Sequence, residues 1–166
     1  YQQILEMPRT KEGNFWHKMI YPNQVWLDGL YMAQPFYIEY ENRFNDKKNY
    51  EDIFHQFFEV ERNMKDRETG LYYHAYDSER KMFWADKETG LSRNFWLRSL
   101  GWFSMALLDT LVLADKDYPD YDHLQQMYRD LIDSMLKFQS PEGMWYQVPN
   151  FPGREKNYLE TSGSSI

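Results

Sequence analysis

Seven side chains of the sequence fall at the ends of extended segments or at the starts of apolar helical stretches, where polar groups can meet. They are one carboxylate, two imidazoles, two cations and two indoles: Asp28, His17, His74, Lys18, Arg98, Trp96 and Trp102. Arginine and lysine hold a carboxylate through charge-assisted hydrogen bonds, and indole faces stack on sugar rings. A carboxyl group beside them could donate or accept a proton. The set therefore predicts a site for an anionic sugar.

Each of these side chains also has a purely structural interpretation, which the residue types alone leave open. Asp28 could be the N-cap of the helix after it, the histidines could be hydrogen-bonded fillers, and the tryptophans could be core residues. Lys18 alone would most often be solvated. Arg98 is harder to explain in this way, because burying an unpaired guanidinium at the start of an apolar helix costs several kcal/mol. An anionic ligand is one natural partner.

Composition excludes several other chemistries. The 166 residues contain no cysteine, and the four histidines lack zinc-binding spacings, so no metal site is expected. The net charge of -7, with both signs spread along the chain, argues against a nucleic-acid partner. The longest apolar run, residues 100–114, contains Asp109 and is shorter than the roughly 20 residues that span a bilayer, so no membrane partner is expected. A soluble protein of the cytoplasm or the periplasm is expected, with the compartment undecided.

Four helical stretches must position these groups. Residues 50–64 and 121–138 place apolar side chains three and four positions apart with polar ones between them, which predicts helices with one dry and one wet face. Residues 25–44 and 95–114 are apolar nearly all round, which predicts helices that protein covers on most sides. This alternation favours an inner ring of helices wrapped by outer ones, whereas a plain four-helix bundle would have helices more alike.

A short extended segment recurs between the helices. Gly13 to His17, Gly70 to His74 and Gly143 to Gln147 each run from a glycine through two aromatic residues to a hydrogen-bonding side chain. The helix starts repeat as well, because Trp26 to Gly29 matches Trp96 to Ser99 at an offset of 70 residues. Such self-similarity marks a repeat of buried helix, outer helix and strand-like loop. About two and a half units are present, so the chain should be incomplete alone.

Taken together, these motifs resemble the unsaturated glucuronyl and rhamnogalacturonyl hydrolases of glycoside hydrolase families 88 and 105, and more closely those of family 105. The residues that carry the resemblance are Tyr21 to Ala33, Gly70 to His74, Trp96 to Arg98 with Trp102, and Tyr158 to Gly163. The resemblance implies an all-α fold, the (α/α)6 barrel of six hairpins, with residues 1–166 as the central portion of a single catalytic domain. Six units would need about 390 residues. The remaining hairpins of the barrel, one with a further site aspartate, would lie outside this chain.

The same resemblance implies an unusual reaction that needs no metal or cofactor. Its substrate would be an oligosaccharide left by a polysaccharide lyase, with a C4=C5 double bond in the terminal uronic acid. Asp28 would protonate C4 and then, as a carboxylate, help water to attack C5, after which the hemiketal opens and releases the next sugar. The other roles would go to the groups that hold the uronate, His17, Lys18, His74 and Arg98, and to the stacking platform, Trp96 and Trp102.

Two other interpretations stay open. One is a different α/α-barrel carbohydrate enzyme, either a sugar epimerase or an inverting hydrolase. The hydrolase would need a second carboxylate on the opposite side of the site from Asp28, and neither Glu160 nor Asp77 is a persuasive candidate. The other is a helical carbohydrate-binding module without catalysis. Because an acidic protein repels an acidic polymer, the ligand should be a short oligosaccharide held by a local basic pocket.

Overall fold

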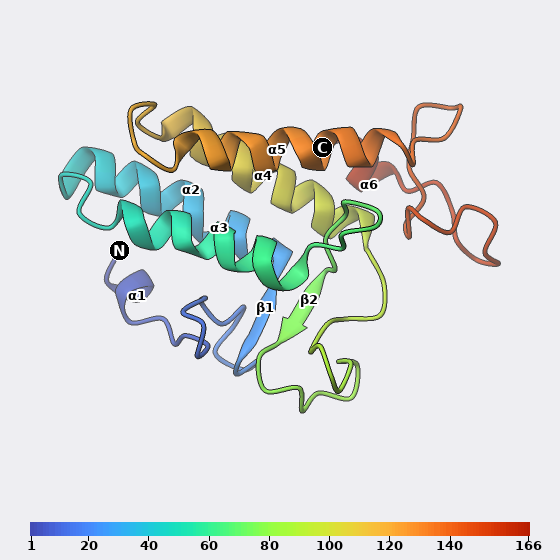
Figure 1. Ribbon diagram of the computed structural model, residues 1–166, viewed down its shortest axis with the longest axis horizontal. Coiled ribbons are helices and arrows are strands. Elements are labelled where there is room, and N and C mark those ends of the chain that lie inside the picture. The colour runs from blue at the N-terminus through green and yellow to red at the C-terminus, as the bar shows by residue number, and fades with distance from the viewer.

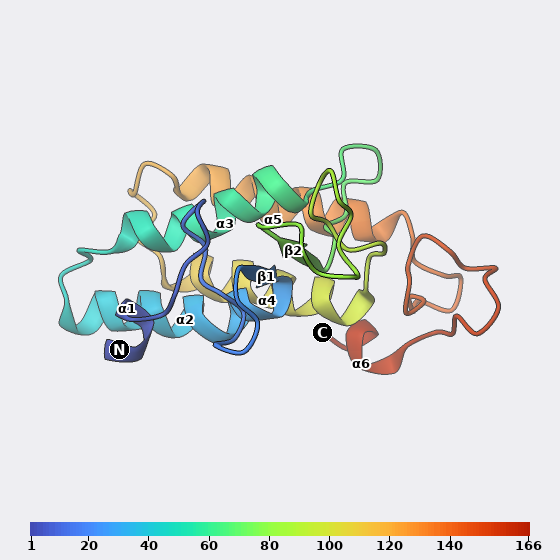
Figure 2. The ribbon, with the colours of Figure 1, turned by 90° about the horizontal axis from the view of Figure 1, so that it is seen from below.

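Two helical hairpins, with strands and loops on one side of them, make up the structure. The computed structural model describes all of residues 1–166. The elements in chain order are α1 (Gln2–Leu5), β1 (Gln24–Trp26), α2 (Leu27–Phe44), α3 (Tyr50–Met64), β2 (Ala75–Asp77), α4 (Leu97–Leu113), α5 (Tyr121–Leu136) and α6 (Thr161–Ser164). Figure 1 shows the four long helices side by side, and Figure 2 shows α2 and α4 in one layer with α3 and α5 in the other. The helix α2 packs on α4, and each of them packs on its outer helix.

The predicted helices are confirmed, with small shifts at their ends. The helix expected over residues 50–64 is α3, and the helix expected to reach residue 138 ends at Leu136. The helices expected to begin at residues 25 and 95 begin two residues later. The residues before α2 are extended because they form β1, in which Val25 lies opposite Tyr76 of β2 in an antiparallel pair.

The core lies between the two layers of helices and contains many of the aromatic side chains. Phe103 of α4 is fully buried, with its ring centroid 4.8 Å from that of Tyr72 and 6.2 Å from that of Phe57. Burial of rings of this size dominates the energetics of a core. The largest fully buried side chains are Tyr37, Tyr50, Tyr72, Phe54, Phe57, Phe103, Leu27, Ile38, Ile53, Met64, Leu71 and Leu97.

The inner helices α2 and α4 are covered on fewer sides than their sequences predict. Phe36 of α2 is 52% exposed and Val112 of α4 is 74% exposed, and Met32 and Leu108 are exposed as well. Residues 1–166 alone therefore do not cover these two helices on most sides, because α3 and α5 both lie in the other layer, on one side of α2 and α4 (Figure 2). None of the helices combines the length and the apolar character needed to cross a membrane.

The polar face of α3 is not fully wet, contrary to the sequence-based expectation. Gln56 is only 1% exposed and Glu59 is also buried. Gln56 is covered because residues 9–15 cross that face of the helix and bond to it. The side chain of Glu59 is paired with Arg62. Helical periodicity describes the apolar stripe well but does not reveal a loop that packs on the opposite face.

Each recurring segment begins at a glycine with a left-handed backbone. The φ angles are +102° at Gly13, +76° at Gly70 and +81° at Gly143, a region that glycine reaches without steric cost. Each glycine N–H closes a tight turn by donating to a carbonyl three or four residues earlier. A fourth turn of this kind lies at Gly90, with φ of +81°. The sequence indicates this fourth turn, because residues 86–91, which contain Gly90, differ at a single position from residues 66–71, which contain Gly70.

Candidate active site

The helices α2 and α4 begin at the same rim of the structure, each preceded by an extended tryptophan. The N–H of Leu27 donates to the carbonyl of His74 at 3.1 Å, and the N–H of Leu97 donates to the carbonyl of Gln147 at 2.9 Å. His74 and Gln147 end two of the recurring segments. Each inner helix start is thus joined to the end of the next recurring segment, and this repeated bond builds the rim.

Asp28 is the second residue of α2, and its carboxylate is directed at α4. Its Oδ2 atom accepts a hydrogen bond from the hydroxyl of Ser99 at 2.7 Å, and Ser99 is fully buried. The N-cap position belongs to Trp26, so the interpretation of Asp28 as the N-cap is wrong. A negative charge in the first helical turn is favoured by the helix dipole. Ser99 thereby fixes the orientation of a carboxylate that stays partly exposed.

Aromatic rings line the rim beside Asp28. The imidazole of His17 stacks on the indole of Trp26 with ring centroids 4.7 Å apart. The ring of His74 meets two indoles at nearly right angles, with centroids 5.9 Å from Trp26 and 5.7 Å from Trp96. These contacts join the two histidines and the two tryptophans into one continuous aromatic surface.

Arg98 extends this surface and has a carboxylate partner in the chain. Its guanidinium lies 4.5 Å from the ring centroid of Trp96, and its Nη1 atom lies 3.6 Å from Glu160 Oε1. The side chain is 39% exposed, so Arg98 is not the buried, unpaired cation that the sequence suggested. Burial acts to raise the pKa of Glu160, but hydrogen bonds from Ser162 and Gly163 and the charge of Arg98 hold that pKa below its usual value. Glu160 is therefore ionised and fixes the guanidinium.

The other two predicted site residues lie beside this surface without joining it. Lys18 is exposed, and its ammonium lies 5.8 Å from the ring centroid of Tyr21, which itself stacks on Trp26. Trp102 lies one turn along α4 from Arg98, with its ring 5.0 Å from that of Tyr31 on α2. The structure thus brings His17, Asp28, His74, Trp96 and Arg98 to one rim and leaves Lys18 and Trp102 at its margins.

The environment of the two rim histidines favours their neutral form. Burial lowers the pKa of His17 and of His74 below the usual 6.5, while the charge of Asp28 acts in the opposite direction on both. Lys18 lowers the pKa of His17 further, and the carbonyl of Asn94 raises that of His74. At neutral pH both imidazoles are therefore uncharged, able to donate one hydrogen bond and accept another.

Titration of His17 and His74 by NMR is expected to give pKa values below 6.5 for both imidazoles. Because the unfolded chain binds these protons more readily, the free energy of unfolding should fall as the pH drops through 6.5 and below. Asp28→Asn removes a charge that raises both pKa values, so both titrations should move to still lower pH. Unchanged titrations in this variant would show that Asp28 does not face the imidazoles.

Several contacts of the rim were not found from the sequence. Trp26 was detectable, because it matches Trp96 at the offset of 70 residues. Ser99 was not, since its partner Asp28 lies on a different helical hairpin.

Asp77 is 2% exposed and its carboxylate accepts three backbone N–H bonds from the loop after β2. Both Asp77 and Glu160 are thus committed to backbone hydrogen bonds, which disfavours either as a second catalytic carboxylate.

Paired helices with a carboxylate, a guanidinium and indoles at the starts of the inner helices, and imidazoles beside them, agree with the α-helical glycoside hydrolases that the sequence motifs resemble. The particular family follows from comparison of the sequence with known proteins. The chain belongs to Glycosyl Hydrolase Family 88, whose profile matches residues 1–166. The resemblance inferred from the motifs is therefore confirmed.

Individual relatives agree with this assignment. A family 105 glycoside hydrolase of C. acetobutylicum has a solved structure that superposes with a TM-score of 0.96 at 48% sequence identity, over 99% of this chain and 46% of that one. The unsaturated rhamnogalacturonyl hydrolase YesR of Bacillus subtilis is 28% identical over 163 residues, which are 95% of this chain and 44% of YesR. A 24.9 kDa protein of the picA locus of Rhizobium radiobacter is 36% identical over 135 residues, 81% of this chain and 57% of that protein. The chain thus spans about half the length of these curated relatives.

Proposed function

We propose that residues 1–166 are the central portion of the catalytic domain of an unsaturated uronyl hydrolase with an (α/α)6 barrel. Family membership and the lengths of the relatives support this proposal. The exposed apolar side chains of α2 and α4, among them Phe36 and Val112, would be covered by the remaining hairpins of the barrel. In the closed ring, α2 and α4 would be inner helices, and α3 and α5 would be outer ones.

The reaction we propose is hydration of the C4=C5 double bond in the terminal uronate of a lyase-generated oligosaccharide. Asp28 in its acid form gives its proton to C4, and the resulting carboxylate takes a proton from the water that bonds to C5. The hemiketal then opens by cleavage of the bond between C5 and the ring oxygen, which gives a ketone at C5 and a hemiacetal at C1. The hemiacetal collapses to an aldehyde, and cleavage of the bond between C1 and the glycosidic oxygen releases the neighbouring sugar. The observation that carries the proposal is the placement of Asp28, which is fixed by Ser99 and close enough to two imidazoles for its charge to act on both.

The rim residues would bind the substrate in complementary ways. Arg98, held by Glu160 and Trp96, presents cationic N–H groups to the uronate carboxylate. The neutral imidazoles of His17 and His74 would bond sugar hydroxyls, and Lys18 would reach an anionic substituent from the margin. The indoles of Trp96 and Trp102 would stack on the sugar faces.

The geometry favours this reaction over the inverting hydrolase. An inverting enzyme places its two carboxyl groups about 6.5–9.5 Å apart, with one of them free to activate water. Asp77 and Glu160, the carboxylates considered for that role, spend their oxygens on backbone N–H groups. A sugar epimerase and a binding module without catalysis remain as alternatives, and substrate turnover distinguishes them.

Arg98→Leu is expected to raise KM for the unsaturated disaccharide by about 10- to 100-fold, because a hydrogen bond to a charged group contributes about 1.5–3 kcal/mol. The fold should persist, since Glu160 keeps its bonds from Ser162 and Gly163. Arg93→Leu removes an exposed arginine five residues away and is the matched control. Steady-state kinetics checks this prediction, and equal KM values for the two variants would remove Arg98 from the substrate site.

The proposed function is tested with a pair of disaccharides that differ only in the C4=C5 bond. The unsaturated uronate absorbs ultraviolet light because its double bond is conjugated with the carboxylate, and hydration abolishes that absorbance. The full-length protein should release sugar from the unsaturated disaccharide with loss of absorbance and leave the saturated one intact. Turnover of the saturated disaccharide would indicate an ordinary hydrolase or an epimerase, and binding without turnover of either would indicate a binding module.

A further inference from the structure

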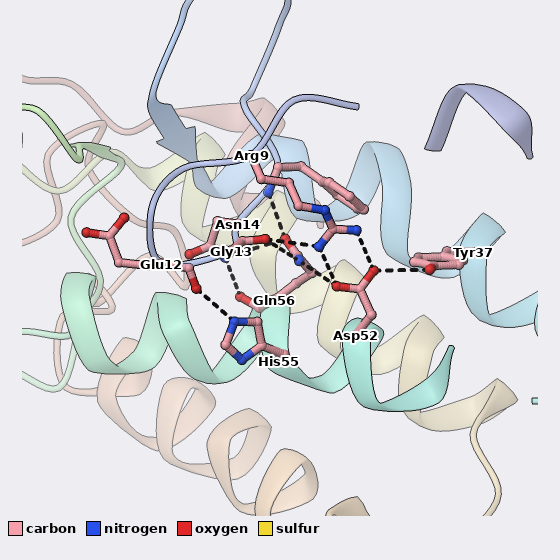
Figure 3. A network of polar contacts seen from close by, with 9 residues as sticks. Arg9, Glu12, Gly13, Asn14, Tyr37, Asp52, His55 and Gln56 are labelled. Atoms are coloured by element: carbon pink, nitrogen blue, oxygen red, sulfur yellow. Dashed lines mark hydrogen bonds and ion pairs between the residues drawn. The ribbon is translucent and has the colours of Figure 1, made fainter. Parts of the chain in front are cut away.

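Residues 8–17 carry His17 to the rim, although they contain no helix. Arg9 and Phe15 form an antiparallel bridge, and the N–H of Trp16 donates to the carbonyl of Pro8 at 2.9 Å. Residues 8–17 thus form a short β-hairpin, called the hairpin below, which turns at Gly13. It lies across α3, where several polar side chains contact it (Figure 3). This outer helix is remote in sequence from the hairpin and carries none of the rim residues.

Gln56 of α3 holds the hairpin backbone at both of its hydrogen-bonding groups. Its Nε2 atom donates to the carbonyl of Gly13 at 3.0 Å, and its Oε1 atom accepts from the N–H of Phe15 at 2.9 Å. The side chain of Asn14 donates in return to the main-chain carbonyl of Gln56 at 3.0 Å. The amide of Gln56 therefore occupies the place that a neighbouring strand would take, and its burial makes these bonds costly to lose.

An ion pair one turn away secures the same hairpin. Arg9 meets the carboxylate of Asp52 with both of its terminal nitrogens, at 2.5 and 2.7 Å, and also donates to the carbonyl of Gly13 at 3.1 Å. Tyr37 of α2 donates to the same carboxylate at 3.0 Å, and Gln56 donates to it at 3.2 Å. As Figure 3 shows, Asp52 and Gln56 project from one face of α3 toward the hairpin.

The hairpin delivers His17 into a tight space. Only Trp16 separates His17 from the Phe15 N–H that Gln56 binds, and the N–H of His17 itself donates to the carbonyl of Gln24 at 2.7 Å. A Cβ atom at Gly29 of α2 would lie 3.1 Å from Nδ1 of His17. Displacement of the hairpin by a fraction of an ångström would therefore change how the imidazole sits against Trp26 and Asp28.

We propose that Gln56 is a positioning residue for His17, acting through the backbone of residues 13–15. The inference rests on the proposed function in one respect, that His17 contacts the substrate. Gln56 itself is not a catalytic residue, because the hairpin and Asp52 take all the hydrogen-bonding groups of its side-chain amide. The charged groups that act on His17 are Asp28 from α2 and Lys18, the next residue in the chain, and neither changes when Gln56 is replaced.

The test is Gln56→Met, which keeps the length of the side chain and removes its hydrogen bonds. In the full-length protein, the NMR titration of His17 is expected to move toward 6.5, because a loosened hairpin admits water, while that of His74 stays unchanged. The value of kcat/KM for the unsaturated disaccharide should fall about 10-fold, mostly through KM. Gln126→Met is the matched control, since Gln126 makes a similar bond to Asp130 on α5 but lies on the exposed surface.

Two further measurements keep the result decisive. If Gln56→Met does not fold, Arg9→Met is the second variant. Its side chain is partly exposed and holds the same hairpin on α3 through Asp52, so its loss should shift the titration of His17 in the same direction by a smaller amount. A His17 titration and a kcat/KM equal to those of the Gln126→Met control would overturn the inference. If His17 shifts as expected but the wild-type protein leaves the unsaturated disaccharide unchanged, the positioning role stands and the proposed function fails.

Discussion

Asp28→Asn is expected to lower kcat for hydration of an unsaturated uronyl disaccharide by about 10²- to 10⁴-fold, the usual contribution of a positioned general acid and base. Asparagine has almost the same shape and can still accept the hydrogen bond from Ser99 through its amide oxygen. The variant can neither give a proton to C4 nor take one from water. The loss should therefore appear in kcat, with KM changed much less, and steady-state absorbance kinetics measures both.

A second aspartate on an inner helix provides the control for this experiment. Asp109 lies on α4, three turns from the rim, and Asp109→Asn makes the same chemical change there. Its kcat should stay within a factor of about two of wild type, because a carboxyl group three turns from the rim cannot exchange a proton with the substrate. Normal turnover by Asp28→Asn would contradict the mechanism, and equal losses in both variants would point to a general effect of charge.

Phe103→Ala is expected to lower the free energy of unfolding by about 3–5 kcal/mol, the usual cost of emptying a buried phenylalanine site. The ring of Phe103 lies between α4 and the α3 layer, against Tyr72 and Phe57. Both layers would therefore lose contacts at once, and the surrounding rings are too large to close the cavity. Chemical denaturation followed by circular dichroism measures the change.

The matched control is Phe83→Ala, which removes the same ring from a side chain that is 86% exposed in the loop after β2. Its free energy of unfolding should stay within about 0.5 kcal/mol of wild type. A comparable destabilisation by both variants would contradict the assignment of the core to the space between the helix layers.

Periodicity predicted α3 and α5 well because each of them buries one apolar stripe, and the nearly continuous apolar character of residues 25–44 and 95–114 predicted α2 and α4. Both properties are local in sequence. The starts of α2 and α4 were displaced by two residues, since the extended residues before them are fixed by partners far along the chain. Before α2, Val25 pairs with Tyr76 of β2, and at the first residue of α4 the N–H of Leu97 donates to the carbonyl of Gln147. Pairing at such separations leaves no local pattern to recognise.

The residues of the candidate site could be predicted where they occupy matching positions of the sequence repeat. Matching helix starts and glycine-led segments placed Asp28, His17, His74 and Arg98 at one rim before any contact was known. The partners that fix these groups were not predictable, because Ser99, Glu160 and Gln56 act across helices or hairpins. Gln56 also sits on the polar stripe of α3, where periodicity indicates solvent.

The most direct test of the proposed reaction is the position of hydrogen isotope in the product formed in deuterium oxide. The full-length protein would be mixed with a lyase-generated disaccharide, and the early product analysed by NMR. Hydration predicts one deuterium bonded to C4 of the released uronate, formed at the rate of absorbance loss and absent with Asp28→Asn. A released uronate that keeps its C4=C5 bond and carries no deuterium from the solvent would contradict the proposed reaction.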